Sequence, residues 1–348
     1  MFQDEVVQRR KWMDEKQYMD LLGATNLIPG PNSTEMTIHI GYQRAGWRGM
    51  IVSGASFILP AMLIVIAFSW AYVRYGALPQ VEWLLSGVEP VVLAIVAQAL
   101  WALGRKTITG LFPALMGIAS VGLYLWGAPP LWILLVAGIV GLLSRNYRRM
   151  LRLPALIFTI PLTGLTAMQS TSQPFSYWTL FLTFLKIGAV LYGSGYVLLA
   201  FLQADFVERL GWISQQQLLD AIAIGQVTPG PVFTAATFIG YILGGVPGAL
   251  LATLAIFLPS FFFVAISNPL IPRIRSSPWA AGLLDGVNYA SLGLMAGVLV
   301  ELSRSNLNTP FGLTLALLSL FLLVRMRVNA TWLILGGGLA GWLWYSLR

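Results

Sequence analysis

Long apolar runs, separated by short polar gaps, dominate the pattern of this chain. Most of the runs reach the roughly 20 residues that a helix needs to cross the hydrocarbon core of a bilayer. The run at 130–144 is short, so we expect it to pair closely with a neighbouring helix. The candidate spans are 50–72, 82–104, 108–126, 130–144, 177–202, 247–268, 279–303, 309–324 and 330–347.

Two segments depart from this pattern. Residues 3–22 combine basic side chains with apolar ones such as Trp12, which is typical of an amphipathic helix at a membrane surface. The stretch 153–169 is apolar, but Pro154 and Pro161 interrupt it, so the pattern predicts a linker there.

The second half of the chain repeats the first. The Pro-Gly-Pro motif at 29–31 recurs at 229–231, an offset of 200, and after a one-residue deletion Gly41 and Gly87 match Gly240 and Gly286 at an offset of 199. A register held over this length predicts two homologous domains. They would comprise residues 1–150 and 176–348, joined by a linker at 151–175.

The distribution of basic residues predicts how the two domains are oriented. If the segments around the two motifs are re-entrant, most of the 21 lysines and arginines fall on the cytoplasmic side, as the positive-inside rule requires. Arg9 then lies inside and its repeat partner Arg209 outside. The sequence therefore predicts an all-α polytopic membrane protein of two inverted-topology repeats, with re-entrant or broken helices at the Pro-Gly-Pro motifs, an architecture recurrent among secondary transporters.

Composition limits the chemistry further. The chain is 57% hydrophobic and only 10% charged, with a mean hydropathy of +0.76, so its solvent is the lipid bilayer and not water. With no cysteine and a single histidine, we expect no metal site, no cofactor and no redox chemistry. The net charge of +8 lies mainly in short gaps between apolar runs, where it orients helices; we expect no nucleic-acid partner.

The two motifs are the strongest candidates for a binding site. Two prolines around a glycine end one half-helix and begin another, whose first N–H groups and positive dipole end attract anions. Neighbouring polar side chains would replace the hydration shell of a tetrahedral oxyanion. The predicted substrate-binding residues are Asn26, Gly30, Asn32, Ser33, Thr34, Lys186, Gln226, Thr228, Gly230, Thr234 and Thr237.

Three charged or titratable residues have alternative interpretations. Glu35 fits a capping box with Asn32, but a carboxylate at membrane depth would also carry a coupling proton. His39, one turn later, would relay that proton or line a polar interface. Lys186 lies within an apolar run, where it would either bind the anion or extend its ammonium group toward the membrane surface.

Together these features resemble the chromate ion transporter family. The resemblance rests on Asn26-Leu27-Ile28-Pro29-Gly30-Pro31, Thr228-Pro229-Gly230-Pro231, the run Phe184-Leu185-Lys186-Ile187-Gly188 with Gly193-Ser194-Gly195, and the repeat, and covers nearly the whole chain. It implies a multi-pass protein of the inner, cytoplasmic membrane that exports chromate and confers chromate resistance, with sulfate as a close mimic of the substrate.

One feature departs from the expected pattern. The first half begins in register with residue 201, so the span at 177–202 has no counterpart there: either this member lacks it, or the sequence starts at an internal methionine. Two other functions remain open, namely a transporter of another small anion or organic acid and, remotely, a membrane-embedded enzyme using Glu35 and His39. We expect no enzyme, and a homodimer is one option for the assembly.

Overall fold

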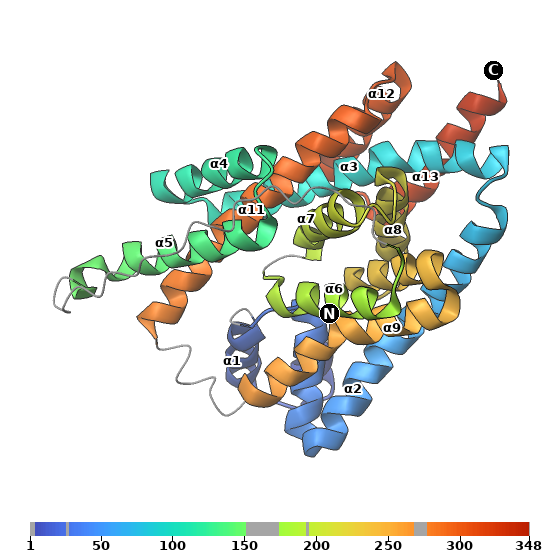
Figure 1. The fold of residues 1–348 in the computed structure, drawn as a ribbon. Coiled ribbons are helices and arrows are strands. Elements are labelled where there is room, and N and C mark those ends of the chain that lie inside the picture. The colour runs from blue at the N-terminus through green and yellow to red at the C-terminus, as the bar shows by residue number, and fades with distance from the viewer. Residues whose placement is uncertain (1–3, 26–27, 151–173, 193–194, 268–276, 348) are drawn as a thin grey trace.

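The computed structural model describes residues 4–25, 28–150, 174–192, 195–267 and 277–347, and these residues form helices and connecting segments without a strand. Figure 1 shows the helices crossing one another at several angles. The predicted all-α class is confirmed.

The helices of the first half precede the long segment that lies outside the described residues. They are η1 (Asp4–Arg9), α1 (Glu15–Thr25), α2 (Asn32–Tyr75), α3 (Pro79–Thr107), α4 (Leu111–Leu125) and α5 (Pro130–Met150).

The second half begins with a helix that has no equivalent in the described part of the first. Its helices are α6 (Tyr177–Val190), η2 (Gly195–Val197), α7 (Leu198–Leu202), η3 (Gln203–Arg209), α8 (Gln215–Val227), η4 (Val232–Thr234), α9 (Ala235–Ser267), α11 (Pro278–Asn306), α12 (Pro310–Phe321), η5 (Leu322–Met326) and α13 (Ala330–Ser346).

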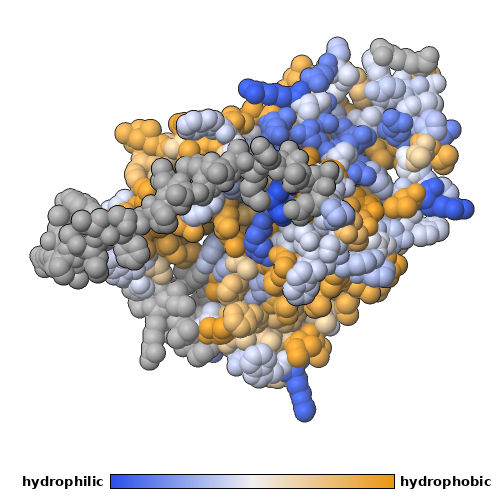
Figure 2. All heavy atoms as spheres, in the orientation of Figure 1, coloured by the Kyte–Doolittle hydropathy of each residue, from blue (hydrophilic) through white to orange (hydrophobic). Residues whose placement is uncertain are grey.

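Four helical stretches are long and apolar enough to cross a membrane: α2, α3, α9 with η4, and α11. Shorter apolar helices accompany them. On α2, Trp47, Leu63 and Trp70 are more than half exposed, which suits contact with lipid tails and would be costly in water. Figure 2 shows hydrophobic side chains spread over this face, with hydrophilic ones gathered mainly in its upper part. The chain is a multi-pass membrane protein.

The predicted span at 177–202 is wrong as a single helix. Helix α6 ends at Val190, and Leu191, which follows, has extended backbone angles (φ −72°, ψ 113°). The chain becomes helical again only at η2, and α7 begins at Leu198. The run contains Gly193-Ser194-Gly195, a sequence signal for a break. The carbonyl of Leu191, just before it, accepts a hydrogen bond from the amide of Gly30, which lies far away in the sequence.

Local conformations recur at the offset between the two halves. Long helices α2 and α9 are both kinked, with positive φ at Gly46 (57°) and at Gly245 (61°). Such angles favour glycine, which has no Cβ to clash with the following carbonyl. The caps recur too: Gln17 bonds with Asp14 ahead of α1, and Gln217 bonds with the cap residue of α8.

Helices of each half pack on a long helix of the other half. Helices α4 and α5 of the first half pack on α11 of the second, while α12 and α13 pack on α3 of the first; α2 and α9 lie side by side (Figure 1). Glycines permit the closest crossings, because a Cβ on Gly87 would overlap the backbone of α13 and a Cβ on Gly286 would overlap that of α5. The domain limits 1–150 and 176–348 stay a prediction, and helices of each half pack on helices of the other.

Candidate functional site

Each Pro-Gly-Pro motif lies between two helices. The first follows α1, and α2 begins at Asn32; the second follows α8, and η4 begins at Val232. Pro31 and Pro231 are the N-cap residues of these new helices, directly before the first turn, with extended backbone angles. The carbonyl group of Pro31 accepts the amide of Thr34 at 2.8 Å, so the helical hydrogen bonds start at the motif itself.

The two motifs meet at one cavity of about 510 Å³, which we call the central cavity. Among the described residues, neutral side chains line it throughout, and the polar ones come from α2, α3 and α11. Its lining includes Pro31, Asn32, Ser33, Thr107, Pro231, Val232, Asn288 and Ser291.

Ser291 provides an unused polar group in this cavity. Its side chain is only 3% exposed, and its hydroxyl oxygen has no hydrogen-bond partner among the described residues. A buried hydroxyl without a partner costs free energy that a bound ligand would recover. Together with the amide of Asn288 and the N-terminus of α2, it makes the central cavity a site suited to an anion.

Both motifs require glycine for two reasons: its backbone angle is positive, and neighbouring side chains leave no room for a Cβ. Gly30 has φ +137° and Gly230 φ +155°. A Cβ on Gly30 would overlap the Glu35 carboxylate and the Ser260 hydroxyl, and a Cβ on Gly230 would overlap Ala61. Since Ser260 and Ala61 are related by the offset of 199, each motif touches the long helix of the other half at the same place.

Behind the first motif lies a group of buried polar side chains without partners. Thr34, Glu35, His39 and Ser260 are each 0% exposed. None of the Thr34 and Ser260 hydroxyls, the two Glu35 carboxylate oxygens or the two His39 ring nitrogens has a partner among the described residues. The alternative of a capping box is therefore wrong for Glu35: the cap residue is Pro31, and the carboxylate does not return to the backbone.

The corresponding part of the second motif has neither an acid nor a histidine. At the offset of 199, His39 corresponds to Phe238 and Ser260 to Ala61, and both counterparts are buried hydrophobic residues. The polar group thus belongs to one motif alone in the described part of the chain, and any proton chemistry there would be asymmetric.

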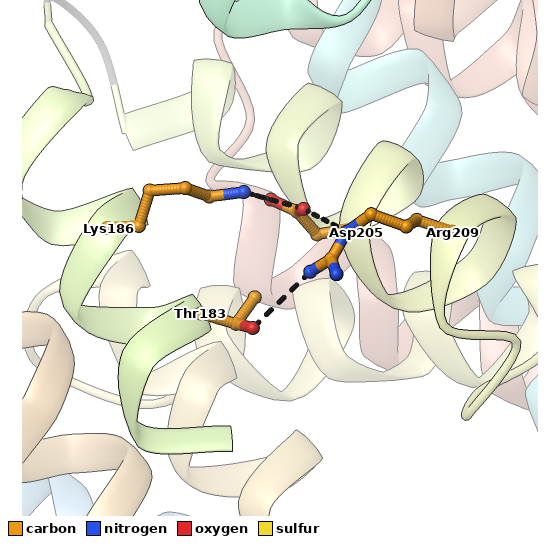
Figure 3. Close-up of polar contacts among 4 residues, drawn as sticks. All are labelled: Thr183, Lys186, Asp205 and Arg209. Atoms are coloured by element: carbon orange, nitrogen blue, oxygen red, sulfur yellow. Dashed lines mark hydrogen bonds and ion pairs between the residues drawn. The ribbon is translucent and has the colours of Figure 1, made fainter. Parts of the chain in front are cut away.

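Lys186 lies in a different cavity. Its ammonium nitrogen is 2.6 Å from the carboxylate of Asp205 on η3, which also accepts a hydrogen bond of 2.9 Å from Arg209 (Figure 3). Arg209 also lies 3.4 Å from the hydroxyl of Thr183 on α6. These residues line a cavity of about 760 Å³, the Lys186 cavity, which also contains Glu208. The two cations face one carboxylate in the triplet, so Lys186 is paired.

The first half has a similar triplet. Glu5 accepts hydrogen bonds from Arg9 at 3.3 Å and from Arg10 at 2.6 Å, and all three side chains are exposed. Glu5 and Arg9 correspond to Asp205 and Arg209 at the offset of 200. One carboxylate between two cations is therefore a feature of both halves.

The threonines near the second motif are committed to local hydrogen bonds. Thr228 donates to the carbonyl of Ile224 at 2.7 Å and Thr234 to that of Pro231 at 2.9 Å, while Thr237 is 2.8 Å from the hydroxyl of Thr253. All three can still accept, but their protons point away from an anion in the central cavity. Their predicted role in binding stays a prediction.

The other predicted residues are placed as follows. Asn32 and Ser33 line the central cavity, and the amide of Gly30 donates to the carbonyl of Leu191. The side-chain nitrogen of Gln226 is buried without a partner among the described residues, outside the lining of the central cavity. Asn26 lies outside the described residues.

Sequence reasoning missed several residues of the site. Thr107, Asn288 and Ser291 reach the central cavity from helices α3 and α11, and Asp205 neutralises Lys186. The only available signal was the presence of polar residues within apolar runs, which does not say where on the folded chain they meet.

The fold and the site define a class: a multi-pass helical membrane protein with a polar cavity lined by residues of both Pro-Gly-Pro motifs. A family model described as "Chromate transporter" matches residues 1–142 and 178–342. The chain belongs to the chromate transporter family, whose members take an oxyanion as substrate. No solved structure matches the chain.

Curated relatives agree with this assignment. The chromate transport protein of Cupriavidus metallidurans is 30% identical over 99% of this chain and 87% of its own length. A probable chromate transport protein of Synechococcus elongatus is 31% identical over 87% of this chain and 79% of its own length. The chromate transport protein of Pseudomonas aeruginosa is 29% identical over 99% of this chain and 86% of its own.

Proposed function

We propose that this protein exports chromate across the cytoplasmic membrane through the central cavity and so confers chromate resistance, with sulfate competing for the same site. The observation that carries the proposal is that two motifs 200 residues apart line one neutral, polar cavity at the start of α2. The three named chromate transport relatives support chromate as the substrate.

Neutral donors are suited to a divalent oxyanion that must also leave again. The first turn of α2 supplies the positive end of a long helix dipole, and Asn32, Ser33, Asn288 and Ser291 supply hydrogen-bonding groups. A cation in this cavity would bind the anion more tightly and slow its release. Chromate and sulfate share charge and shape, so this arrangement accepts both.

Glu35 and His39 are our candidates for proton coupling. A carboxyl group and an imidazole, one helical turn apart and buried without partners, can each hold a proton in one state and release it in another. Because the Glu35 carboxylate lies against Gly30, a change in the charge of Glu35 would act directly on the backbone of the first motif.

Alternating access would follow from two oppositely oriented halves. In this proposal Arg9 faces the cytoplasm and Arg209 the outside. The packing of α4 and α5 on α11, and of α12 and α13 on α3, holds the halves together while the motif helices move.

Export can be tested in everted membrane vesicles, whose outer face is the cytoplasmic one. Energised vesicles carrying the protein should accumulate labelled chromate, and sulfate should reduce that uptake. Uptake of an organic acid with no response to chromate or sulfate would instead indicate a transporter of another substrate. The negative control is vesicles carrying Asn288→Leu, in which an apolar side chain replaces an amide of the central cavity and uptake should be lost.

A further inference from the structure

A cluster of two carboxyl groups and one phenol lies beside the Lys186 cavity. The hydroxyl oxygen of Tyr124 is 3.3 Å from a carboxylate oxygen of Glu208 and 3.1 Å from one of Glu301. The second oxygen of Glu301 accepts a hydrogen bond of 3.0 Å from the amide nitrogen of Gln203, which is fully buried. Tyr124 comes from α4 and both glutamates from the second half, so the cluster exists because α4 packs on α11.

The number of protons in this cluster is limited by geometry. A phenol has one proton and can donate it to only one of the two carboxylates. An ionised second carboxylate would face the lone pairs of the phenol oxygen, with a like charge beyond it, so this arrangement is favoured when one of the two carboxyl groups carries a proton and donates it to Tyr124.

The surroundings indicate which glutamate holds that proton. Glu301 is half-buried: one of its carboxylate oxygens accepts a hydrogen bond from Gln203, and the other lies 3.1 Å from the Tyr124 hydroxyl, against 3.3 Å for Glu208. Glu208 is exposed and lines two cavities. Glu208 is therefore the member that can exchange its proton with water.

The charge of Glu208 decides the charge of the Lys186 cavity. The described charged residues lining that cavity are Lys186, Arg209, Asp205 and Glu208. With Glu208 ionised, the two cations and two carboxylates cancel; with Glu208 protonated, one positive charge is left over. On the other side of Tyr124, Arg304 lines a neighbouring cavity of about 530 Å³ together with Glu208 and Glu301.

We propose that Glu208, Tyr124 and Glu301 form a proton-sharing triad that makes the Lys186 cavity an anion site only when Glu208 is protonated. When a divalent oxyanion binds there, the Glu208 carboxylate takes up one proton from the solvent. No other bond forms or breaks. The site is a collecting site for the anion on its way to or from the central cavity, so this inference rests on the proposed function.

Binding of labelled chromate to the purified protein in detergent tests the triad. The measurement is made under mildly alkaline conditions, where free chromate is a dianion; the chain has no cysteine that chromate would oxidise. Affinity should fall by about tenfold for each rise of one pH unit, as expected when one proton binds with each anion. Addition of chromate in weak buffer should remove about one proton per anion bound.

Three variants separate the triad from a structural role. Glu208→Gln mimics the protonated state, so it should bind chromate with an affinity independent of pH and without proton uptake. Tyr124→Phe removes the bridging oxygen and should move the midpoint of the pH dependence toward that of an isolated carboxyl. Glu82→Gln, an exposed acid outside all three cavities, is the matched control and should behave as the wild type.

A wild-type slope in Glu208→Gln, or no slope in the wild-type protein, would overturn the inference. The proposed function fails by a different result: wild-type protein that binds chromate with the expected slope in detergent but does not carry it in vesicles. Binding and flux therefore report on the two proposals separately.

Discussion

The amide nitrogen of Gly30 lies 2.8 Å from the carbonyl oxygen of Leu191 and donates a hydrogen bond to it. This contact joins the first Pro-Gly-Pro motif to the point where α6 ends, 161 residues further along the chain. Helix α6 belongs to the second half, so a helix of the second half supports the motif of the first. The break in α6 provides the free carbonyl that the motif needs.

Gly30→Ala should therefore destabilise the protein. The positive φ of Gly30 is unfavourable for alanine, and the added Cβ would overlap the Glu35 carboxylate, so we expect a loss of about 2 kcal/mol or more. Thermal unfolding in detergent measures this. The control is Gly122→Ala on α4, where a Cβ meets open space and should be neutral or stabilise the helix by up to about 1 kcal/mol. Equal unfolding temperatures for Gly30→Ala and the wild type would refute this explanation of the motif.

Ser291→Ala should reduce transport without reducing stability. Its hydroxyl has no partner to lose among the described residues, so the unfolding free energy should stay within about 1 kcal/mol of the wild type. Chromate flux should fall about tenfold, the effect of one lost hydrogen bond to a charged group. Ser120→Ala removes an equally buried serine hydroxyl that bonds to its own helix, and its flux should be unchanged. Equal flux in both variants would argue against Ser291 as a ligand.

Glu35→Gln should separate transport from the proton gradient. Glutamine is similar in size but cannot release a proton, so flux driven by an imposed pH gradient should fall to the level seen without a gradient. The fold should be retained, because the substitution removes an unpartnered carboxyl group from a buried position. Glu82→Gln again serves as the control, and both variants are compared in proteoliposomes. If flux through Glu35→Gln still follows the gradient, the coupling proton is elsewhere.

The Lys186 triplet should tolerate the loss of a cation better than the loss of its carboxylate. In Lys186→Ala, Asp205 keeps Arg209, and since the Lys186 side chain is 37% exposed we expect a loss of less than about 1 kcal/mol. Asp205→Ala leaves two cations facing each other and should cost about 2 kcal/mol, because both remain partly exposed. Both stabilities are measured by thermal unfolding in detergent, where the reverse order would contradict this view of the triplet.

Lys186→Ala should nevertheless abolish chromate resistance in cells. The substitution removes one of the two cations that draw the anion into the Lys186 cavity, while most of the stability remains. Growth on chromate is compared at matched amounts of protein in the membrane, and full resistance would remove Lys186 from the pathway.

Much of the fold could be predicted from sequence, because the bilayer imposes strong rules. Apolar run length gave most of the helices, including α3 and α11. The repeat aligned the two motif glycines, Gly30 and Gly230, which share a positive φ. These features depend on local composition and on backbone angles that only glycine adopts readily.

What the sequence did not predict depends on contacts between distant segments. At the break, the carbonyl of Leu191 accepts a hydrogen bond from the amide of Gly30. The packing of α13 on α3 depends on close contacts between glycines, such as Gly87 with Gly341. Lys186 was identified as a candidate, but its partner Asp205 was not, since Lys186 lies within the apolar run 177–202 and Asp205 lies beyond its end. The contribution of Ser291 to the central cavity likewise follows only from the packing of α11.

The most direct test of the account is labelled chromate flux in proteoliposomes containing wild-type protein, Asn288→Leu or Thr314→Leu. Leucine at 288 places an apolar side chain in the central cavity, whereas Thr314 is exposed on α12, away from it. The account predicts that wild-type and Thr314→Leu vesicles take up chromate and that folded Asn288→Leu is no better than empty vesicles. Wild-type flux through folded Asn288→Leu would contradict it.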